Sequence, residues 1–567
     1  MRESPFVKNG KTLLGIDPVR LSQRTADAVT VKERTLYFCP SPLYGYGLER
    51  LLERLEEAPD SAILCVEADA ELYELSIKSG VSSLAPEKKL RITNVSEAEK
   101  LCAFVREAWG ARAFRRIETV RFSGGWQLFP ELYNSLCEAL SREIAVDWSN
   151  AMTLAKLGRL YIRNALRNLP LAARFPSIEK LSFGESPVLV LGAGPSLDET
   201  LDALCRRFAQ TLAPENRPFK IICVDTCLGA LKDRQITPDL AVILESQHWN
   251  LRDFTGCRGW EVPSAVDLSA LPESARMLSD GFLFMTPWTH LRIFERLKSA
   301  ALLPAIFPPL GSVGLTAVEI ARRASSGKII CSGLDFSFTA DKYHARGTPG
   351  HRGKLNAQTR LRAMFNAAAF DSASFAASSK NGCPVRSNPA MQNYRDLFEQ
   401  EFAGDPRLFD IEGSGLSLGI KTLSMEDALE KISRRGTEIA EGAKKREKKE
   451  FTGEDFTQRR KNAENAEERE GEMGERRLLT EKVLIFFEGE KKRLEELRGI
   501  LTGEASGQER LNVLVDECDY LWAHFPDYSG GRRPDLIESS PSALSFLKRL
   551  RAEIDPMLKL IERVIHV

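Results

Sequence analysis

A pattern of apolar strand, glycine turn and helix recurs in the middle of this chain, and it constrains the fold more than any other feature. Residues 186–208 contain an apolar run, a glycine turn and an amphipathic segment. Residues 219–246 supply strand, helix and strand, and residues 311–338 supply loop, helix and strand. The apolar runs at 281–289 and 302–309 are further strand candidates. Near-continuous apolar strands alternating with helices predict a parallel sheet covered on both faces.

The N-terminal segment predicts a smaller sheet of the same kind. Residues 34–40 and 61–69 have the aromatic and β-branched composition of strands, and residues 47–58 have the apolar spacing of a helix. Gly45 and Gly47 lie in the first turn, but this turn is not a clean dinucleotide-binding fingerprint. We therefore expect a structural Rossmann-like domain and leave open whether its turn binds a ligand.

The composition changes along the chain and predicts four segments. Residues 444–477 are densely charged with both signs, and residues 543–565 form an amphipathic helical pattern. The predicted fold class is α/β, with a Rossmann-like parallel-sheet central domain, a smaller α/β N-terminal domain and a helical C-terminal domain. The expected boundaries are 1–150 for the N-terminal domain, 151–180 for a helical bridge, 181–425 for the central domain and 426–567 for the helical accessory domain.

Charge and cysteine usage exclude several classes of protein. The 79 Lys and Arg residues balance 79 Asp and Glu residues, which argues against a general nucleic-acid binder. No apolar run is long enough for a membrane-spanning helix, and the start of the chain lacks a secretory signal, so we expect a cytoplasmic protein with no membrane insertion. The eleven cysteines form no Cys-x-x-Cys pair and the six histidines are dispersed, so we expect no structural metal site.

The candidate site lies where the central strands end, because ligands of open α/β sheets bind beyond the carboxyl ends of the strands. Glycine turns that open helices offer backbone amides to an anion such as a phosphate. Asp225 and Thr226 either contact a ribose or cap a helix. The candidates in these loops are Gly192, Gly194, Pro195, Ser196, Asp225, Thr226, Glu245, Ser312, Gly314 and Gly333.

Titratable residues are densest after the last strongly apolar strand. Asp335 follows that strand, and a buried carboxylate there needs a partner or a ligand. Tyr343, His344, Arg346 and His351 come directly afterwards. This group is the strongest sequence signal for chemistry, and its histidines titrate near neutral pH.

The motifs at 190–202, 224–246, 311–321 and 333–347 together resemble the motility accessory factor family. Members of that family are flagellin glycosyltransferases with an MptE-like domain, which is shared with 6-hydroxymethylpterin diphosphokinases. The turn at 45–55 and the strand residues 65–69 also look like the N-terminal domain of that family, so the resemblance covers about residues 30 to 425. The same motifs are similar to those of bacterial sialyltransferases that use CMP-sugars.

The resemblance implies an inverting transfer of a nonulosonic acid, of pseudaminic or legionaminic type, from a CMP-sugar to Ser or Thr of flagellin, needed for flagellum assembly and motility. Asp225 or Asn250 would read the ribose or base. His344, or less readily His351, would act as the base, with Asp335 and Glu245 as the next candidates. The chemistry requires no obligatory metal, although Mg²⁺ stays open.

Two other functions remain as alternatives. A pterin diphosphokinase would need Mg²⁺ on acidic ligands, which Asp225, Glu245 and Asp335 could supply. A non-catalytic accessory protein would bind flagellin through its helical C-terminal domain. Consumption of a CMP-nonulosonate, of ATP with a pterin, or of neither distinguishes the three.

Overall fold

The structure of the chain is a computed structural model. It describes residues 5–58, 60–84, 86, 88–110, 113–208, 213–278, 280–339, 342–361, 363–364, 373–433, 456–503, 507–526, 533–534, 536 and 540–566. The chain forms two compact units, which are described separately. Unit 1 contains residues 1–159 and 522–535, and unit 2 contains residues 160–521 and 536–567.

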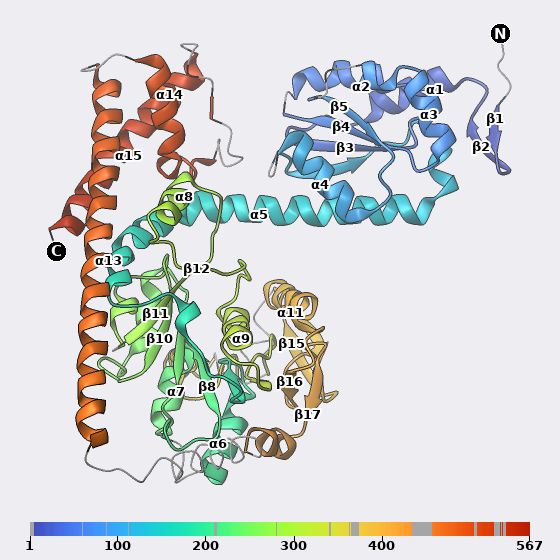
Figure 1. The fold of residues 1–567 in the computed structure, drawn as a ribbon. Helices are drawn as coiled ribbons and strands as arrows, with labels where there is room; N and C mark the ends of the chain where they lie inside the picture. Colours follow the sequence, from blue (N-terminus) through green and yellow to red (C-terminus); the bar gives the residue numbers. More distant parts are fainter. Residues whose placement is uncertain are drawn as a thin grey trace. The chain divides into compact units, whose positions relative to one another are not determined.

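Unit 1 is built on a four-stranded parallel sheet of order β5-β4-β3-β6 (Figure 1). Its strands are β3 (Thr35–Pro40), β4 (Ala62–Val66), β5 (Leu90–Thr93) and β6 (Arg116–Thr119), preceded by the hairpin β1 (Phe6–Lys8) and β2 (Lys11–Leu14). Its helices are α1 (Pro18–Ala28), α2 (Leu48–Arg54), α3 (Ala70–Lys78), α4 (Ala98–Trp109) and the first part of α5 (Pro130–Asn168). Along the chain, β4 and β5 are added in turn on one side of β3, and β6 is then added on the other side of β3.

Successive side chains of β3 enter two different cores, as the period of a strand requires. Leu36 and Phe38 are buried in a cluster with residues of α4 and α5. Tyr37 and Cys39 are buried in a second cluster with residues of α1 and α2. Because both faces are covered, every residue of the strand is buried, which is why no alternation of apolar and polar residues is visible in its sequence.

Unit 2 contains a nine-stranded sheet of order β12-β11-β10-β9-β8-β7-β13-β16-β17, in which every neighbouring pair is parallel (Figure 1). The strands are β7 (Val188–Leu191), β8 (Lys220–Val224), β9 (Leu240–Ile243), β10 (Pro263–Asp267), β11 (Asp280–Met285), β12 (Ala305–Ile306), β13 (Ile329–Ser332), β16 (Leu408–Ile411) and β17 (Lys421–Leu423). A separate antiparallel hairpin joins β14 (Phe375–Ser378) to β15 (Pro384–Ser387).

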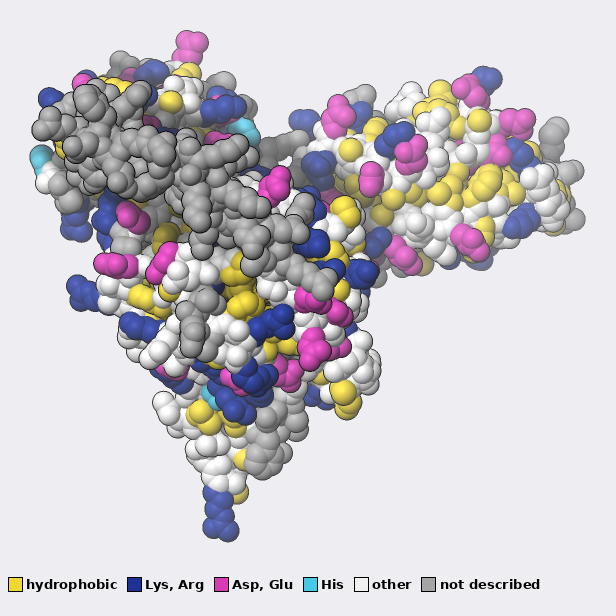
Figure 2. Space-filling model, turned by 60° about the horizontal axis from the view of Figure 1, so that its bottom comes forward, with side chains coloured by type: hydrophobic (Ala, Val, Ile, Leu, Met, Phe, Trp, Pro, Cys, Tyr) yellow, Lys and Arg dark blue, Asp and Glu magenta, His cyan; other side chains and the backbone are white. Residues whose placement is uncertain are grey.

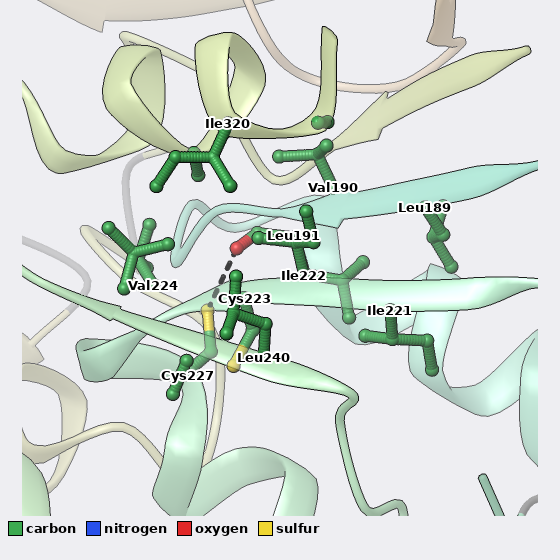
Figure 3. Packing of buried hydrophobic residues seen from close by; sticks show 14 of the residues in the cluster. Leu189, Val190, Leu191, Ile221, Ile222, Cys223, Val224, Cys227, Leu240 and Ile320 are labelled. Atoms are coloured by element: carbon green, nitrogen blue, oxygen red, sulfur yellow. Dashed lines mark hydrogen bonds between the residues drawn. The ribbon is translucent and has the colours of Figure 1, made fainter. Parts of the chain in front are cut away.

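The centre of this sheet is buried on both faces. Figure 3 shows Leu189 to Leu191 of β7 beside Ile221 to Val224 of β8, with Ile320 of α9 (Val313–Ala324) above them. The remaining helices of the sheet region are α6 (Leu197–Phe208), α7 (Leu228–Asp233), α8 (Arg292–Ser299), α10 (Pro349–Ala357) and α11 (Pro389–Phe402). This core fixes the strands whose ends carry the candidate site.

The C-terminal part of unit 2 is helical, with α13 (Phe456–Thr502), α14 (Gln508–Glu517) and α15 (Pro541–Ile565). The Arg296 guanidinium on α8 donates to both carboxylate oxygens of Glu490 on α13, at 2.7 and 3.0 Å. Glu490 is buried, so this paired charge joins the helices to the sheet region. Of the charged stretch expected at 444–477, residues 444–455 lie outside the described part of the chain, and residues 456–472 are described for their backbone in α13 but not for their side chains.

The last turns of α5 lie against loops that follow two strands of the large sheet. The Asn164 side-chain amide donates to the carbonyl oxygens of Ser246 and Ser269 at 3.0 and 3.1 Å. The Asn168 amide donates to those of Leu268 and Ala270 at 3.1 and 2.8 Å. These four bonds occupy carbonyl groups beyond the carboxyl ends of β9 and β10.

The predicted fold class is confirmed, with parallel sheets in both units and helices at the C-terminus. Among the described helices, none has both the length and the apolar composition needed to cross a membrane. On the face drawn in Figure 2, the coloured Lys and Arg side chains alternate with Asp and Glu side chains. This mixture fits the zero net charge of the whole sequence.

Candidate functional site

The strand order of the large sheet reverses between β7 and β13. The chain leaves β7 and adds β8 to β12 on one side, then crosses back to β13, β16 and β17 on the other. Loops that follow neighbouring strands at such a switch diverge and leave a crevice where ligands of α/β proteins bind. The glycine turn after β7 and the loop after β13 therefore define the candidate site.

These two loops are joined by hydrogen bonds. The Gly194 amide donates to the carbonyl oxygen of Gly333 at 2.8 Å. The Ser196 amide and hydroxyl donate to the two carboxylate oxygens of Asp335 at 2.7 and 2.5 Å. Ser196 and Asp335 are both buried. The partner that the sequence required for Asp335 is thus Ser196, within the protein itself.

The glycines of the turn are needed for packing between the loops. A Cβ atom at Gly194 would lie 2.5 Å from Asp335 Oδ2, and one at Gly192 would lie 2.4 Å from the carbonyl oxygen of Gly333. Packing within the protein is therefore sufficient reason for the two glycines, and the reason expected from the sequence, room for a ligand to approach the backbone, stays a prediction. The contacts that exclude a side chain come from the neighbouring loop.

Positive charges lie near the Asp335 carboxylate. Burial raises the pKa of Asp335, whereas the hydrogen bonds from Ser196 and the charges of Lys380 and Lys342 lower it. Lys380 is itself buried in an ion pair with Asp410, at 2.6 Å. Burial also raises the pKa of Asp410 to about 6. The sequence analysis missed Lys380 and Asp410, which come from the β14–β15 hairpin and from β16.

Asp198, in the first turn of α6, positions the loop that carries the candidate base. Its buried carboxylate accepts hydrogen bonds from Lys342 Nζ at 3.1 Å and from the Arg346 amide at 2.9 Å. The amide of Ala345 donates to the carbonyl oxygen of Ala193 at 3.0 Å. The loop at 342–347 therefore lies against the glycine turn, as its position after β13 predicted.

His344 lies within this loop with its ring partly buried. Among the described residues its Nδ1 atom is buried and has no hydrogen-bond partner. Burial lowers the pKa of His344, and the nearby Lys354 and His351 lower it further. These effects favour the neutral form of the imidazole. His351 lies in the first turn of α10, where its amide donates to Thr348 Oγ1 at 3.3 Å.

Asp225 and Asn250 meet beyond the ends of β8 and β9. The Asn250 Nδ2 atom donates to Asp225 Oδ2 at 2.6 Å and to Asp253 Oδ2 at 3.3 Å. Asp225 Oδ1 accepts from the amide of Thr226 at 2.8 Å. Burial raises the pKa of Asp225 to about 6 and that of Asp253 to about 7, where the charge of Asp225 adds to the effect.

The side-chain oxygen of Asn250 has no hydrogen-bond donor. Asn250 Oδ1 is buried and, among the described residues, accepts no hydrogen bond. An unpaired buried acceptor is costly, so it is typical of a position that a ligand or a water molecule completes. Glu245, in contrast, is exposed and accepts from the amide of Gln247 at 2.8 Å.

Ser312 and Gly314 open helix α9, which packs against the central strands. The Ser312 side chain makes no capping hydrogen bond, so it does not satisfy the first amides of the helix. A Cβ atom at Gly314 would lie 2.6 Å from Leu334 Cδ2, the same distance as one at Gly192. Both glycine turns therefore touch Leu334, and the start of α9 lies close to the turn after β7.

The acidic residues expected to hold Mg²⁺ in a diphosphokinase have separate partners. Asp225 is bound to Asn250, Asp335 to Ser196, and Glu245 to its own loop. Within the described ranges, no group of His, Cys, Asp and Glu residues is arranged to hold a metal ion. Mg²⁺ needs only one or two carboxylates together with substrate phosphates, so binding of Mg²⁺ by these residues stays a prediction.

Sequence comparisons identify relatives over most of the chain. Residues 163–341 match the family described as 6-hydroxymethylpterin diphosphokinase MptE-like. An uncharacterized protein of Treponema pallidum (strain Nichols) is 29% identical over 550 residues, covering 96% of this chain and 90% of that protein. A second uncharacterized protein of the same strain is 26% identical over 140 residues, covering 24% of this chain and 65% of its own length.

The fold is similar to that of MAf glycosyltransferase from Magnetospirillum magneticum AMB-1. The TM-score is 0.54 with 15% sequence identity, and the match covers 100% of this chain and 84% of that chain. The MptE-like match and this shared fold confirm the resemblance noted in the sequence. Residues 163–341 thus match the MptE-like family, and the chain as a whole has a fold similar to that of a MAf glycosyltransferase.

Proposed function

We propose that this chain is an inverting glycosyltransferase that transfers a nonulosonic acid from its CMP-activated form to Ser or Thr hydroxyls of flagellin in the cytoplasm. The fold it shares with a MAf glycosyltransferase supports transfer of a sugar in general. The choice of donor and acceptor rests on the motif resemblance and on the chemistry of the site.

The observation that carries the proposal is the unpaired acceptor atom Asn250 Oδ1, which lies beyond the ends of β8 and β9. Asn250 Oδ1 is buried without a donor beside the Asp225 carboxylate. A nucleotide supplies such donors, from ribose hydroxyls or from the exocyclic amine of cytosine. The nucleotide of the donor would therefore lie over Asp225 and Asn250.

The phosphate of the nucleotide would lie at the start of α9. The amides of its first turn have no side-chain cap from Ser312, and a helix N-terminus attracts an anion. These donors would stabilise the charge that develops on the departing phosphate. Ser196 has a different role, because its hydroxyl already donates to Asp335.

The neutral imidazole of His344 would act as the general base. The acceptor hydroxyl oxygen attacks the anomeric carbon of the sugar while its proton moves to the imidazole, and the bond from that carbon to the CMP phosphate oxygen breaks. CMP leaves with the electron pair of that bond. His351, Asp335 and Glu245 are the next candidates for the base. No step requires a metal ion, since CMP carries less charge than a diphosphate. Reactions with EDTA test whether Mg²⁺ takes part.

The test is transfer by the full chain with CMP-pseudaminic or CMP-legionaminic acid and flagellin of the source organism, read as the mass gain of intact flagellin. A general base contributes on the order of 10² to 10⁴ in rate, so His344→Ala should lose that factor while the affinity for CMP changes little. His290→Ala, which removes an exposed imidazole, is the matched control. Parallel reactions with EDTA report whether Mg²⁺ is needed.

Three outcomes would contradict the proposal. Turnover of ATP with 6-hydroxymethylpterin would favour the diphosphokinase, and binding of flagellin with no sugar transfer would favour the accessory protein. Normal transfer by His344→Ala would remove His344 as the base. In that case His351→Ala, Asp335→Asn and Glu245→Gln are compared next.

A further inference from the structure

Unit 1 contains a pocket of about 140 Å³ at the carboxyl edge of its own sheet. Phe38 and Pro40 of β3 and Thr119 of β6 form one side of this pocket. These two strands are neighbours, and the strand order β5-β4-β3-β6 reverses between them. The pocket therefore lies at the switch point of the smaller sheet, the place where α/β folds bind ligands. The glycine turn considered in the sequence is not among its lining residues.

The other walls come from α5 and from the loop after β6. Tyr133, Asn134, Cys137 and Glu138 of α5 line the pocket, with Arg121 and Trp126 on the loop. The Arg121 guanidinium lies 4.2 Å from the centre of the Trp126 ring. Among the described residues Arg121 forms no ion pair, so its hydrogen-bond donors are available to a ligand.

The aromatic wall is fixed by a buried network behind it. The Tyr133 hydroxyl donates to Glu67 Oε1 at 3.3 Å and accepts from the amide of Ala68 at 3.0 Å. Ser41 Oγ donates to Glu67 Oε2 at 2.6 Å, and Glu67 is 1% exposed. Because these partners are buried and satisfied, the pocket is formed before any ligand arrives.

The size and the charge of the pocket select the ligand. Sites for drug-sized molecules measure about 300–1,000 Å³, so this pocket has room for one ring rather than for a dinucleotide. Arg121 and Glu138 carry opposite charges, which disfavours a phosphate or another strong anion. Asn134 and Thr119 can each donate and accept hydrogen bonds.

We propose that this pocket binds one neutral pyranose ring, free or attached to a protein. The C–H face of a pyranose packs on an aromatic ring such as that of Trp126, which is partly exposed in the pocket, whereas the buried Phe38 and Tyr133 close its inner side. Its hydroxyls both donate and accept, as the guanidinium, carboxylate, amide and hydroxyl of the pocket require. This site is separate from the transfer site proposed above and does not depend on that activity.

The test uses the full chain and four probes: the methyl glycosides of glucose, galactose and mannose, and N-acetylglucosamine. Ligands of this size with ordinary efficiency bind with a Kd on the order of 1 mM, which saturation-transfer NMR measures. Asn134→Ala should weaken binding by about two- to tenfold, the effect of one neutral hydrogen bond. Ser135→Ala, at the neighbouring exposed position of α5, is the matched control and should leave the Kd unchanged.

A second readout locates the bound sugar. Cys137 is partly exposed in the pocket, and Cys383 is exposed in unit 2. The bound sugar should slow alkylation of Cys137, measured by peptide mass spectrometry, and leave alkylation of Cys383 unchanged. Sugar binding without protection of Cys137 would mean that the sugar occupies another site.

Three results would overturn the proposal. In the first, none of the four probes binds at concentrations tenfold above the expected Kd. In the second, a probe binds but neither Asn134→Ala nor the Cys137 readout responds. In the third, CMP protects Cys137 better than any sugar, which would assign the pocket to a nucleotide. None of these results bears on transfer at the large sheet.

Discussion

The Asp335 carboxylate accepts hydrogen bonds from both the amide and the hydroxyl of Ser196, a residue 139 positions earlier in the chain. The two residues follow β7 and β13, the neighbouring strands between which the order of the large sheet reverses. This buried carboxylate therefore joins the two loops at the switch, together with the hydrogen bond from the Gly194 amide to the Gly333 carbonyl oxygen. The candidate site depends on these bonds before any ligand is considered.

Replacing Ser196 by Ala should lower the free energy of unfolding. The substitution leaves one oxygen of a buried carboxylate without its hydroxyl donor, which costs about 1–3 kcal/mol. Urea unfolding of the full chain measures the change. Ser326→Ala, which alters an exposed serine of the same unit, should change the stability by no more than about 0.5 kcal/mol. Equal stability of the two variants would show that the Ser196–Asp335 bond contributes nothing.

Gly194→Ala should destabilise the protein even though it adds a single methyl group. The new Cβ would lie 2.5 Å from Asp335 Oδ2 and 2.7 Å from the Gly333 carbonyl oxygen, so one loop must shift, at about 1–3 kcal/mol. Gly353→Ala is the control, because nothing lies within 4 Å of its Cβ position and the residue is helical. That control should gain about 0.5–1 kcal/mol. Unchanged stability of Gly194→Ala in the unfolding assay would argue against the close loop packing.

The sequence predicted the strand ends but could not predict which contacts form between them. Each buried strand can be recognised from its local apolar composition, so the sequence predicts the positions of the loops after β7, β8 and β13. The bond from Ser196 to Asp335 and the packing at Gly194 depend on which strands become neighbours, and strand order is not a local property. Lys380 shows the same limit: the Asn381-Gly382 turn signals a hairpin, but nothing nearby indicates that Lys380 reaches Asp410.

Stability should fall as the pH rises from about 4 to 7, because of Asp225 and Asp253. Their folded-state pKa values, about 6 and about 7, lie above the ordinary value of 3.8. The folded protein therefore binds protons more tightly than the unfolded chain in this window, and deprotonation destabilises it. For Asp225 the shift corresponds to about 3 kcal/mol as an upper limit.

Asp225→Asn isolates this effect. The substitution removes the buried charge but keeps an acceptor for the Thr226 amide, so the slope of stability against pH between 4 and 7 should become smaller. Thermal unfolding across that range measures the slope. A slope equal to that of the wild type would mean that Asp225 does not titrate there.

Arg296→Ala should be among the more destabilising single changes in unit 2. It leaves the buried Glu490 without the guanidinium that binds both of its oxygens, although Arg493 still contacts one of them. Leaving a buried charge with no partner costs about 3–5 kcal/mol, and the loss here should lie below that range because Arg493 and the Tyr520 hydroxyl still contact Glu490. Arg498→Ala is the comparison, because its pair with Asp555 is exposed and should contribute about 0–1 kcal/mol. Similar losses from both variants in urea unfolding would contradict the assignment.

Lys380→Met should destabilise the protein more at pH 8 than at pH 5. The buried Asp410 loses its cation, and its pKa, already raised to about 6, rises further. At pH 5 the carboxyl group is protonated and needs no counter-charge, whereas at pH 8 the unpaired charge costs about 3–5 kcal/mol. Unfolding curves at the two pH values test this difference, and the double variant with Asp410→Asn should remove it.

The boundary of the family match falls inside helix α5 and so differs from the boundary of a folded part of the chain. The family match begins at residue 163, within a helix that runs from Pro130 to Asn168. A fragment starting there would keep Asn164 and Asn168 on less than two helical turns, too short to be stable alone. Its end at residue 341 would also discard Lys342, Lys380 and Asp410, whose charges surround Asp335. The segment that matches the family model is therefore not a module that can be cut out and kept whole, because residues that complete its edges come from the rest of the chain.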